Sequence, residues 1–93
     1  MKTDTTHVSW PEVFSALASE PRLRIVELLS HGRVQCQEIL AQLDLSQPAI
    51  SYHLSKLERA GVLRKERQGT RNCYQLREEV LELVQLIRSR RED

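Results

Sequence analysis

The residues with the clearest chemical potential lie in the run SQPAISYHLSKLERAG, which begins at Ser46. Amide, hydroxyl and phenol groups occur in this run at helical spacing, on the side away from its apolar residues. Groups of this kind exchange hydrogen bonds with base edges in a DNA groove. The alternative is a solvated polar helix face that has no further role. The candidate base-contacting residues are Gln47, Pro48, Ser51, Tyr52, Ser55 and Lys56.

Positive charge is concentrated beside this run. Residues 56–71 contain six basic and two acidic residues, a net charge of +4, whereas the rest of the chain sums to −3. A basic patch on a mildly acidic body favours a polyanion as partner, above all the phosphate backbone of double-stranded DNA. A membrane surface is the weaker alternative, because the stretch lacks a wide apolar face. Arg67, Thr70 and Arg71 are the candidate backbone contacts, with solubilising charges as the alternative.

Residue sets for catalysis or metal binding do not stand out in the sequence. The three histidines, His7, His31 and His53, are far apart in the chain, and no convergence with other ligands is indicated. There is no Ser-His-Asp order and no glycine-rich phosphate loop. We therefore expect no enzyme activity, no bound metal and no cofactor.

The helices that must position the candidate residues are predicted by caps and prolines. Ser9 with Glu12 has the spacing of a capping box, and Ser19 and Ser46 each precede a proline that falls in the first turn of a helix. A short third helix is expected to end near Asp44, two or three residues before the fourth begins. Such a tight junction is typical of a helix-turn-helix, whose second helix enters the major groove.

Beyond Gly61 the apolar spacing changes from helical to alternating. Residues 62–66 and 72–76 predict two strands of a β-hairpin, with residues 67–71 as its basic turn. A final helix follows that is apolar on more than one side, which indicates burial against a partner chain as well as against its own. The apolar residues of this helix are Val80, Leu81, Leu83, Val84, Leu86 and Ile87.

The 93 residues leave room for a single domain, covering residues 1–93. A core of this size is marginal by itself, so dimerisation is expected. No apolar run approaches the roughly 18 residues of a membrane span, and the first residues lack the apolar core of a signal peptide. We therefore expect a cytoplasmic protein with reduced cysteines and no membrane partner.

Three segments of the chain resemble segments of a known protein family and occur in the same order. They are LASEPRLRIVELL, LSQPAISYHLSKLERAGVL, and a GxxxxYxL pattern from Gly69 to Leu76. Together they make residues 17–76 resemble the ArsR/SmtB family of winged-helix bacterial repressors. The resemblance implies a mainly α winged helix-turn-helix with about five helices and a wing of two or three strands. It further implies a homodimer, formed largely by the first and last helices, that blocks transcription at an inverted repeat. Gln47, Pro48, Ser51 and Tyr52 would then be base-facing, and His53 structural.

The two usual metal sites of that family are not intact in this sequence. Gln35 and Gln37 occupy the positions of a Cys-x-Cys pair in the third helix, with Cys36 between them, and an amide is not the soft anionic ligand such metals prefer. The last helix offers glutamates, but no histidine follows His53. The resemblance therefore implies a signal other than these metals.

Cys36 and Cys73 are a candidate redox pair. In the winged-helix topology the extended step at 33–35 pairs antiparallel with strand 72–76, and we assume a register that sets Val34 opposite Gln75. Cys36 then faces Cys73 at a Cα distance of about 4.5 to 5.5 Å, within disulfide range. The alternative is two reduced cysteines that fill apolar space.

The sequence as a whole predicts a homodimeric, sequence-specific DNA-binding repressor. The alternative is a winged-helix protein-interaction module whose basic hairpin meets an acidic partner. A protein-docking helix would be expected to expose an apolar patch, which Gln47, Ser51 and Ser55 do not provide.

Overall fold

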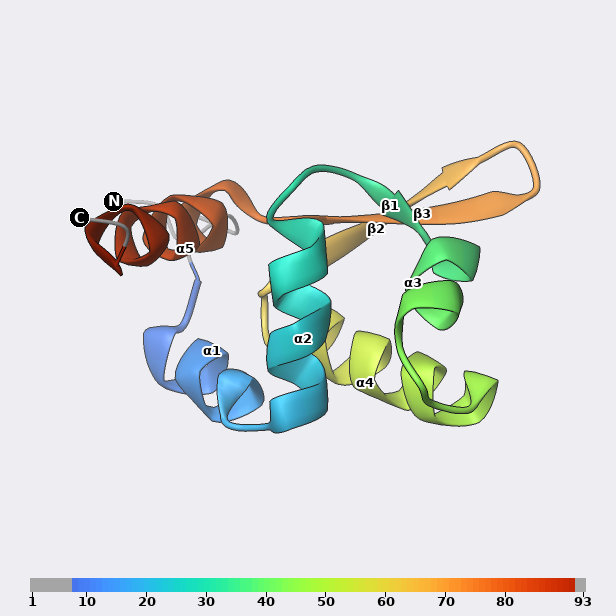
Figure 1. Ribbon diagram of the computed structural model, residues 1–93, viewed down its shortest axis with the longest axis horizontal. Helices are drawn as coiled ribbons and strands as arrows, with labels where there is room; N and C mark the ends of the chain where they lie inside the picture. Colours follow the sequence, from blue (N-terminus) through green and yellow to red (C-terminus); the bar gives the residue numbers. More distant parts are fainter. Residues whose placement is uncertain (1–7, 92–93) are drawn as a thin grey trace, which may run out of the picture.

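Five helices and a three-stranded sheet make up the part of the chain that the computed structural model describes, residues 8–91 (Figure 1). His7 lies outside these residues. The order confirms the expected mainly α winged helix-turn-helix, and none of the described helices is long and apolar enough to cross a membrane. The elements are α1 (Trp10–Leu17), α2 (Glu20–Leu29), β1 (Val34–Gln35), α3 (Cys36–Gln42), α4 (Gln47–Arg59), β2 (Leu63–Gln68), β3 (Arg71–Leu76) and α5 (Glu78–Arg91).

Three helices begin at the predicted serines. Ser19 and Ser46 each accept a side-chain hydrogen bond from the backbone N–H three residues later, at 3.4 and 3.2 Å. Ser9 precedes α1 but its side chain makes no capping hydrogen bond, so the capping box predicted with Glu12 is wrong. The proline in the first turn of each helix has no N–H to leave unpaired and a backbone angle that already suits a helix.

The hairpin turn is shorter than the sequence predicts. Gln68 pairs with Arg71, so the turn consists of Gly69 and Thr70 alone, and Arg67 and Arg71 are strand residues. Gly69 has a φ of +63°, a conformation that two-residue hairpin loops require and that glycine adopts without steric cost. The outer part of the hairpin carries no apolar alternation, so the hydrophobic pattern could not mark where the strands end.

The sheet has the order β1-β3-β2, and the register assumed for β1 is wrong by one residue. Val34 pairs with Tyr74 and Gln35 pairs with Cys73, while Cys36 is the first residue of α3. The strand has only two residues, too few for an alternating pattern to fix its register. Both cysteines are free, and the register that would have made them a redox pair does not occur.

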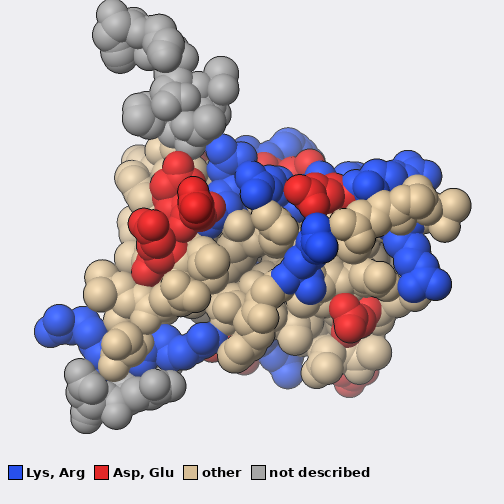
Figure 2. Space-filling view, turned by 90° about the horizontal axis from the view of Figure 1, so that it is seen from above, with Lys and Arg blue, Asp and Glu red and all other residues tan. Residues whose placement is uncertain are grey.

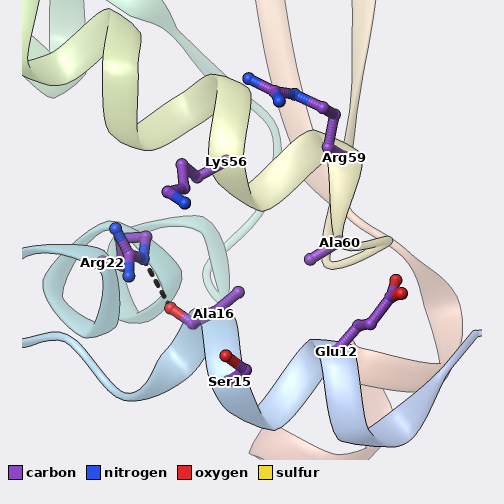
Figure 3. A pocket seen from close by; sticks show the side chains of 7 residues that line it. All are labelled: Glu12, Ser15, Ala16, Arg22, Lys56, Arg59 and Ala60. Atoms are coloured by element: carbon purple, nitrogen blue, oxygen red, sulfur yellow. Dashed lines mark hydrogen bonds between the residues drawn. The ribbon is translucent and has the colours of Figure 1, made fainter.

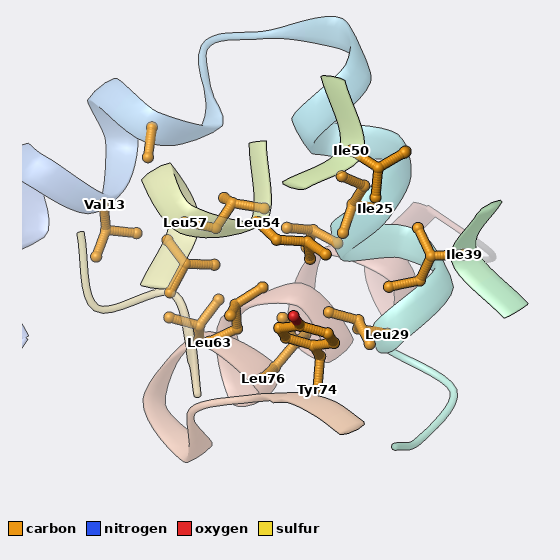
Figure 4. Close-up of a cluster of buried hydrophobic side chains, with 14 of the residues drawn as sticks. Val13, Ile25, Leu29, Ile39, Ile50, Leu54, Leu57, Leu63, Tyr74 and Leu76 are labelled. Carbon is orange, nitrogen blue, oxygen red and sulfur yellow. The ribbon is translucent and has the colours of Figure 1, made fainter. Parts of the chain in front are cut away.

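The hydrophobic core lies between the helices and one face of the sheet (Figure 4). On α4 the predicted stripe of Ile50, Leu54 and Leu57 is buried, which turns the opposite side of that helix to solvent. Full burial of each such side chain contributes about 1.5 to 3 kcal/mol. The largest fully buried side chains are Ile25, Leu29, Ile39, Ile50, Leu57, Leu63, Val13, Val62 and Val80.

Arg22 connects the corner between α1 and α2 to the middle of α4. Its Nε donates a hydrogen bond to the Ala16 carbonyl at 2.6 Å, and its Nη1 lies 3.2 Å from Nδ1 of His53. Burial, and secondarily the charge of Arg22, lower the pKa of His53 below its usual value. A neutral imidazole accepts the arginine N–H, whereas an imidazolium would repel it. His53 therefore has the structural place that the family resemblance implies.

Replacement of Leu57 by alanine should lower the free energy of unfolding by about 2 to 5 kcal/mol, because the fully buried side chain leaves a cavity. Tyr52→Ala, on the exposed side of the same helix, should change it by less than about 0.5 kcal/mol. Urea denaturation at one fixed protein concentration measures both. Equal losses of unfolding free energy would show that α4 does not have one buried face and one exposed face.

Replacement of His53 by asparagine should make stability less sensitive to acid. The folded-state pKa of His53 lies below that of the unfolded chain, so the unfolded state takes up the proton first and stability falls as the pH drops through about 6.5. Asparagine keeps an acceptor for Arg22 and does not titrate. The free energy of unfolding of the wild type should therefore fall relative to that of His53→Asn as the pH drops from 7.5 to about 5.5. A difference that stays constant over this range would contradict the lowered pKa of His53 as the cause.

Candidate nucleic-acid interface

The exposed side of α4 carries all six residues predicted to meet DNA bases. The hydrophobic stripe of the helix is buried, and because the helix repeats every 3.6 residues the polar positions emerge together on the other side. Tyr52 is 56% exposed, which is unusual for a large aromatic side chain in a small domain. The exposed set is Gln47, Pro48, Ser51, Tyr52, Ser55 and Lys56.

The junction between α3 and α4 fixes this helix against the rest of the motif. Residues 43–46 separate the two helices, slightly more than predicted, because α3 ends at Gln42, two residues before the expected Asp44. Leu43 has an extended backbone (φ −110°, ψ 140°) and a buried side chain, so it anchors the turn in the core. The arrangement is the predicted helix-turn-helix.

The wing, defined as β2, β3 and their turn, exposes Arg67, Thr70 and Arg71 at the surface. Thr70 and Arg71 line the same hollow as Gln47, the first residue of α4. Nη1 of Arg71 donates a hydrogen bond to Oε1 of Gln35 at 3.2 Å, which joins the wing to the residue before α3. A hollow of about 280 Å³ separates the wing from the beginnings of α3 and α4, with Gln47 and Thr70 in its wall. Gln47 from the predicted base contacts and Thr70 and Arg71 from the predicted backbone contacts thus border one hollow.

Charge around this surface is mainly positive. Figure 2, which looks onto the sheet, shows Lys and Arg side chains around the wing at the right of the view. Glu66 in the wing forms an ion pair with Arg33 at 3.2 Å, so its charge is locally balanced. The first turn of α4 contains no acidic residue, which leaves the partial positive charge of the helix N-terminus available to an anion.

Two basic residues near α4 were not among the predicted site residues. Arg59 is exposed one turn beyond Ser55, and its Nη2 donates a hydrogen bond to the Ser55 hydroxyl at 3.3 Å. The helical spacing of Tyr52, Ser55 and Arg59 would have been enough to find it. Arg22 reaches α4 from a distant part of the sequence, so no local pattern could have indicated it. Both line a hollow between α1 and α4 (Figure 3).

Within residues 8–91 the fold does not bring together three or more His, Cys, Asp or Glu side chains that could hold a metal ion. Gln35 and Gln37, at the positions where the resembled family has cysteines, lie beside Cys36 in the wall of the hollow next to the wing. The chemistry that the described surface offers is therefore hydrogen bonding and positive charge.

A second surface, made by α1, α2 and α5, is apolar. Phe14, Leu23 and Ile87 are each about half exposed and line a groove of about 500 Å³ between these helices. Trp10 stacks near Phe14 with ring centroids 5.9 Å apart. One side of the groove is held by Arg88, which donates a hydrogen bond to the buried Ser30 hydroxyl. Most of its lining residues belong to α1 and α5, which lie at the opposite end of the molecule from the wing (Figure 1).

Known proteins resemble this chain in both sequence and fold. The family model described as bacterial regulatory protein, arsR family, matches residues 19–65. An HTH-type transcriptional regulator of Methanocaldococcus jannaschii is 35% identical over 78 residues, which cover 82% of this chain and 88% of the relative. The transcriptional repressor SdpR of Bacillus subtilis is 34% identical over 70 residues, 75% of this chain and 78% of the repressor.

Among solved structures, a homodimeric winged helix-turn-helix DNA-binding domain from Mycobacterium bovis superposes with a TM-score of 0.80 and 28% identity, over 89% of this chain and 78% of that one. The relatives are transcriptional regulators, which confirms the expectation of a protein that is not an enzyme. With its helix-turn-helix, its wing and a family match over half its length, the chain belongs to the ArsR family of bacterial regulatory proteins and is a DNA-binding transcriptional regulator.

Proposed function

We propose that the protein is a homodimeric repressor that binds an inverted-repeat operator, with α4 of each subunit in the major groove. The observation that carries the proposal is the hollow between α4 and the wing, where the exposed Gln47 of α4 and the exposed Arg71 of the wing line the same wall. Base edges are read by side chains with donors and acceptors, whereas phosphates are held by charge. The surface offers both in adjacent positions.

In this proposal, the side chains of α4 recognise the base sequence of the operator. The Gln47 amide has the donor and acceptor needed for the major-groove edge of adenine, and the Ser51 hydroxyl serves either role. Tyr52 adds a hydroxyl and an apolar ring that suits a thymine methyl group. The arginines of the wing hold backbone phosphates or enter the neighbouring minor groove.

The second subunit covers the apolar groove of α1, α2 and α5. Half-exposed Phe14, Leu23 and Ile87 form a continuous apolar surface of the kind that marks an interface, and a domain of this size gains stability from burying it. The homodimeric state of the similar Mycobacterium bovis domain supports the same assignment. A two-fold axis presents α4 twice, which matches an inverted repeat.

Selection of bound duplexes from a random library tests the function directly. A repressor of this kind should enrich one inverted repeat with half-site centres about 34 to 36 Å apart, or a multiple of that distance. The selected duplex should bind about 10³-fold or more tightly than random DNA at the same salt concentration. Equal binding of all duplexes, or none, would reject the proposal and favour a protein-interaction module.

Alanine substitutions on α4 and the wing should have different effects. Gln47→Ala and Tyr52→Ala should reduce discrimination at particular base pairs by about 1 to 3 kcal/mol. Arg67→Ala should weaken binding to all duplexes and reduce the salt slope by about 1 for each half-site. Binding titrations on the selected duplex and on single-base variants of it, across a salt series, measure both quantities. Sequence-independent losses from all three substitutions would contradict this division.

A charge placed in the apolar groove should separate the subunits. Ile87→Glu puts a carboxylate into an apolar interface, where burial without a partner is costly, so we expect a monomer that has lost most of its operator affinity. Gln85→Glu adds the same charge at an exposed polar position of α5 and should leave the dimer intact. Analytical ultracentrifugation and operator titration check both variants; a dimeric Ile87→Glu protein would show that the subunits meet elsewhere.

A further inference from the structure

A basic hollow of about 260 Å³ lies between α1 and the C-terminal half of α4, outside the surface shared by α4 and the wing (Figure 3). Three of the residues around it are positively charged and one is a carboxylate. Arg22 has a structural role, and Lys56 and Arg59 lie in the last turn of α4, where positive charge favours the helix dipole. All three also line this hollow. The lining residues are Glu12, Ser15, Ala16, Arg22, Lys56, Arg59 and Ala60.

The positive charge in this hollow is not neutralised from within. Among the residues the structure describes, neither Arg22, Lys56 nor Arg59 forms an ion pair. The carboxylate of Glu12 lies beside Ala60, across the hollow from Arg22 (Figure 3). Like charges held close together raise each other's energy, and an anion between them removes that cost.

Two donors, Arg22 and Lys56, lie on the same side of α4, whereas the Arg59 guanidinium points away from them (Figure 3) and donates a hydrogen bond to the Ser55 hydroxyl at 3.3 Å. Arg22 is fixed through Nε and Nη1, which leaves the N–H groups of Nη2 outside those two contacts. The Lys56 side chain extends from α4 towards Arg22 (Figure 3). Its Nζ also lies 5.7 Å from the centre of the Tyr52 ring, which connects the hollow with the base-reading side chains. A guanidinium and an ammonium around one opening suit the several oxygens of a phosphate group.

The geometry of α4 indicates where such a phosphate would come from. The helix has 13 residues, and at 1.5 Å per residue it is about 20 Å long, whereas the major groove is about 12 Å wide. A helix that reads bases with its N-terminal half therefore reaches the groove edge with its last turns. Lys56 and Arg59 lie on those turns, and the sugar-phosphate backbone forms that edge.

We propose that Arg22, Lys56 and Arg59 form a binding site for one backbone phosphate of the operator, at the opposite end of α4 from the wing. The site rests on the proposed function and extends it: each subunit clamps the duplex on both sides of the groove that α4 reads. Arg22 is the fixed donor, and the two residues of α4 complete the site when DNA binds.

The test uses the exposed residues, because Arg22 also supports the fold. Arg59→Gln and Lys56→Gln should each reduce the salt slope of binding by about 1 for each half-site and the affinity by about tenfold for each half-site at 0.1 M salt. Base discrimination should be unchanged in Arg59→Gln, because Arg59 lies outside the six predicted base contacts. Arg90→Gln, which removes the same charge from an exposed position on α5, should change neither quantity. Thermal melts of the free proteins confirm that each variant is folded.

Neutral methylphosphonate linkages, placed one at a time along the selected duplex, identify the phosphate. One position in each half-site should weaken wild-type binding but have no further effect on Arg59→Gln, because the two changes remove the same contact. Additive losses at every position would overturn the site. Operator binding by Arg59→Gln with the wild-type affinity and salt slope would also overturn it, while leaving the proposed function intact. Failure of the wild type to bind any selected duplex would overturn both.

A titration with inorganic phosphate tests whether the hollow binds free phosphate and not the operator backbone. If the hollow holds a free phosphate in place of the operator backbone, calorimetry without DNA should show saturable binding of phosphate that Arg59→Gln abolishes, and that result would overturn the assignment to DNA. We expect no saturable binding at millimolar phosphate, since a single phosphate is not held in place by the rest of the duplex.

Discussion

The buried stripe of α4 is the constraint on which the other features depend. Ile50, Leu54 and Leu57 fill the centre of the core, so the rotation of the helix about its axis is fixed by packing against α2 and the sheet. Rotation by even one residue would bring polar side chains into the core and expose apolar ones, at a cost of several kcal/mol. The residues that face the partner are therefore selected by the residues that face the core.

Charge is distributed in a way that fits this geometry. The acidic residues outnumber the basic ones outside residues 56–71, and within that stretch the exposed cations lie on α4 and on the wing. Apolar exposure occurs mainly elsewhere, in the groove of α1, α2 and α5. One end of a small domain thus suits a polyanion and the other suits a second subunit, so the two associations do not compete for the same surface.

Most of the fold could be predicted because its signals are local. Ser19 and Ser46 cap helices through atoms three residues away, and the stripe of α4 repeats within one element. The six base-facing candidates follow from that stripe. Two of the errors arose where the local pattern ended: a two-residue strand has no alternation to set its register, and the outer wing has no apolar residues to mark its turn. Contacts such as Arg22 with His53, 31 residues apart, require the tertiary fold.

The hydrogen bond between Arg71 and Gln35 has a mechanical consequence. The outer hairpin projects beyond the core and, as a two-stranded ribbon, would bend freely if it were attached only at its base. Gln35 is also the N-cap residue of α3, where its backbone N–H donates a hydrogen bond to Glu38 Oε1 at 3.0 Å. The hydrogen bond between Arg71 and Gln35 therefore restrains the hairpin relative to the first helix of the helix-turn-helix. Because a guanidinium has five N–H groups, Arg71 can keep this hydrogen bond while it binds an anion. Less freedom remains to be lost on binding, so tighter association follows from rigidity alone.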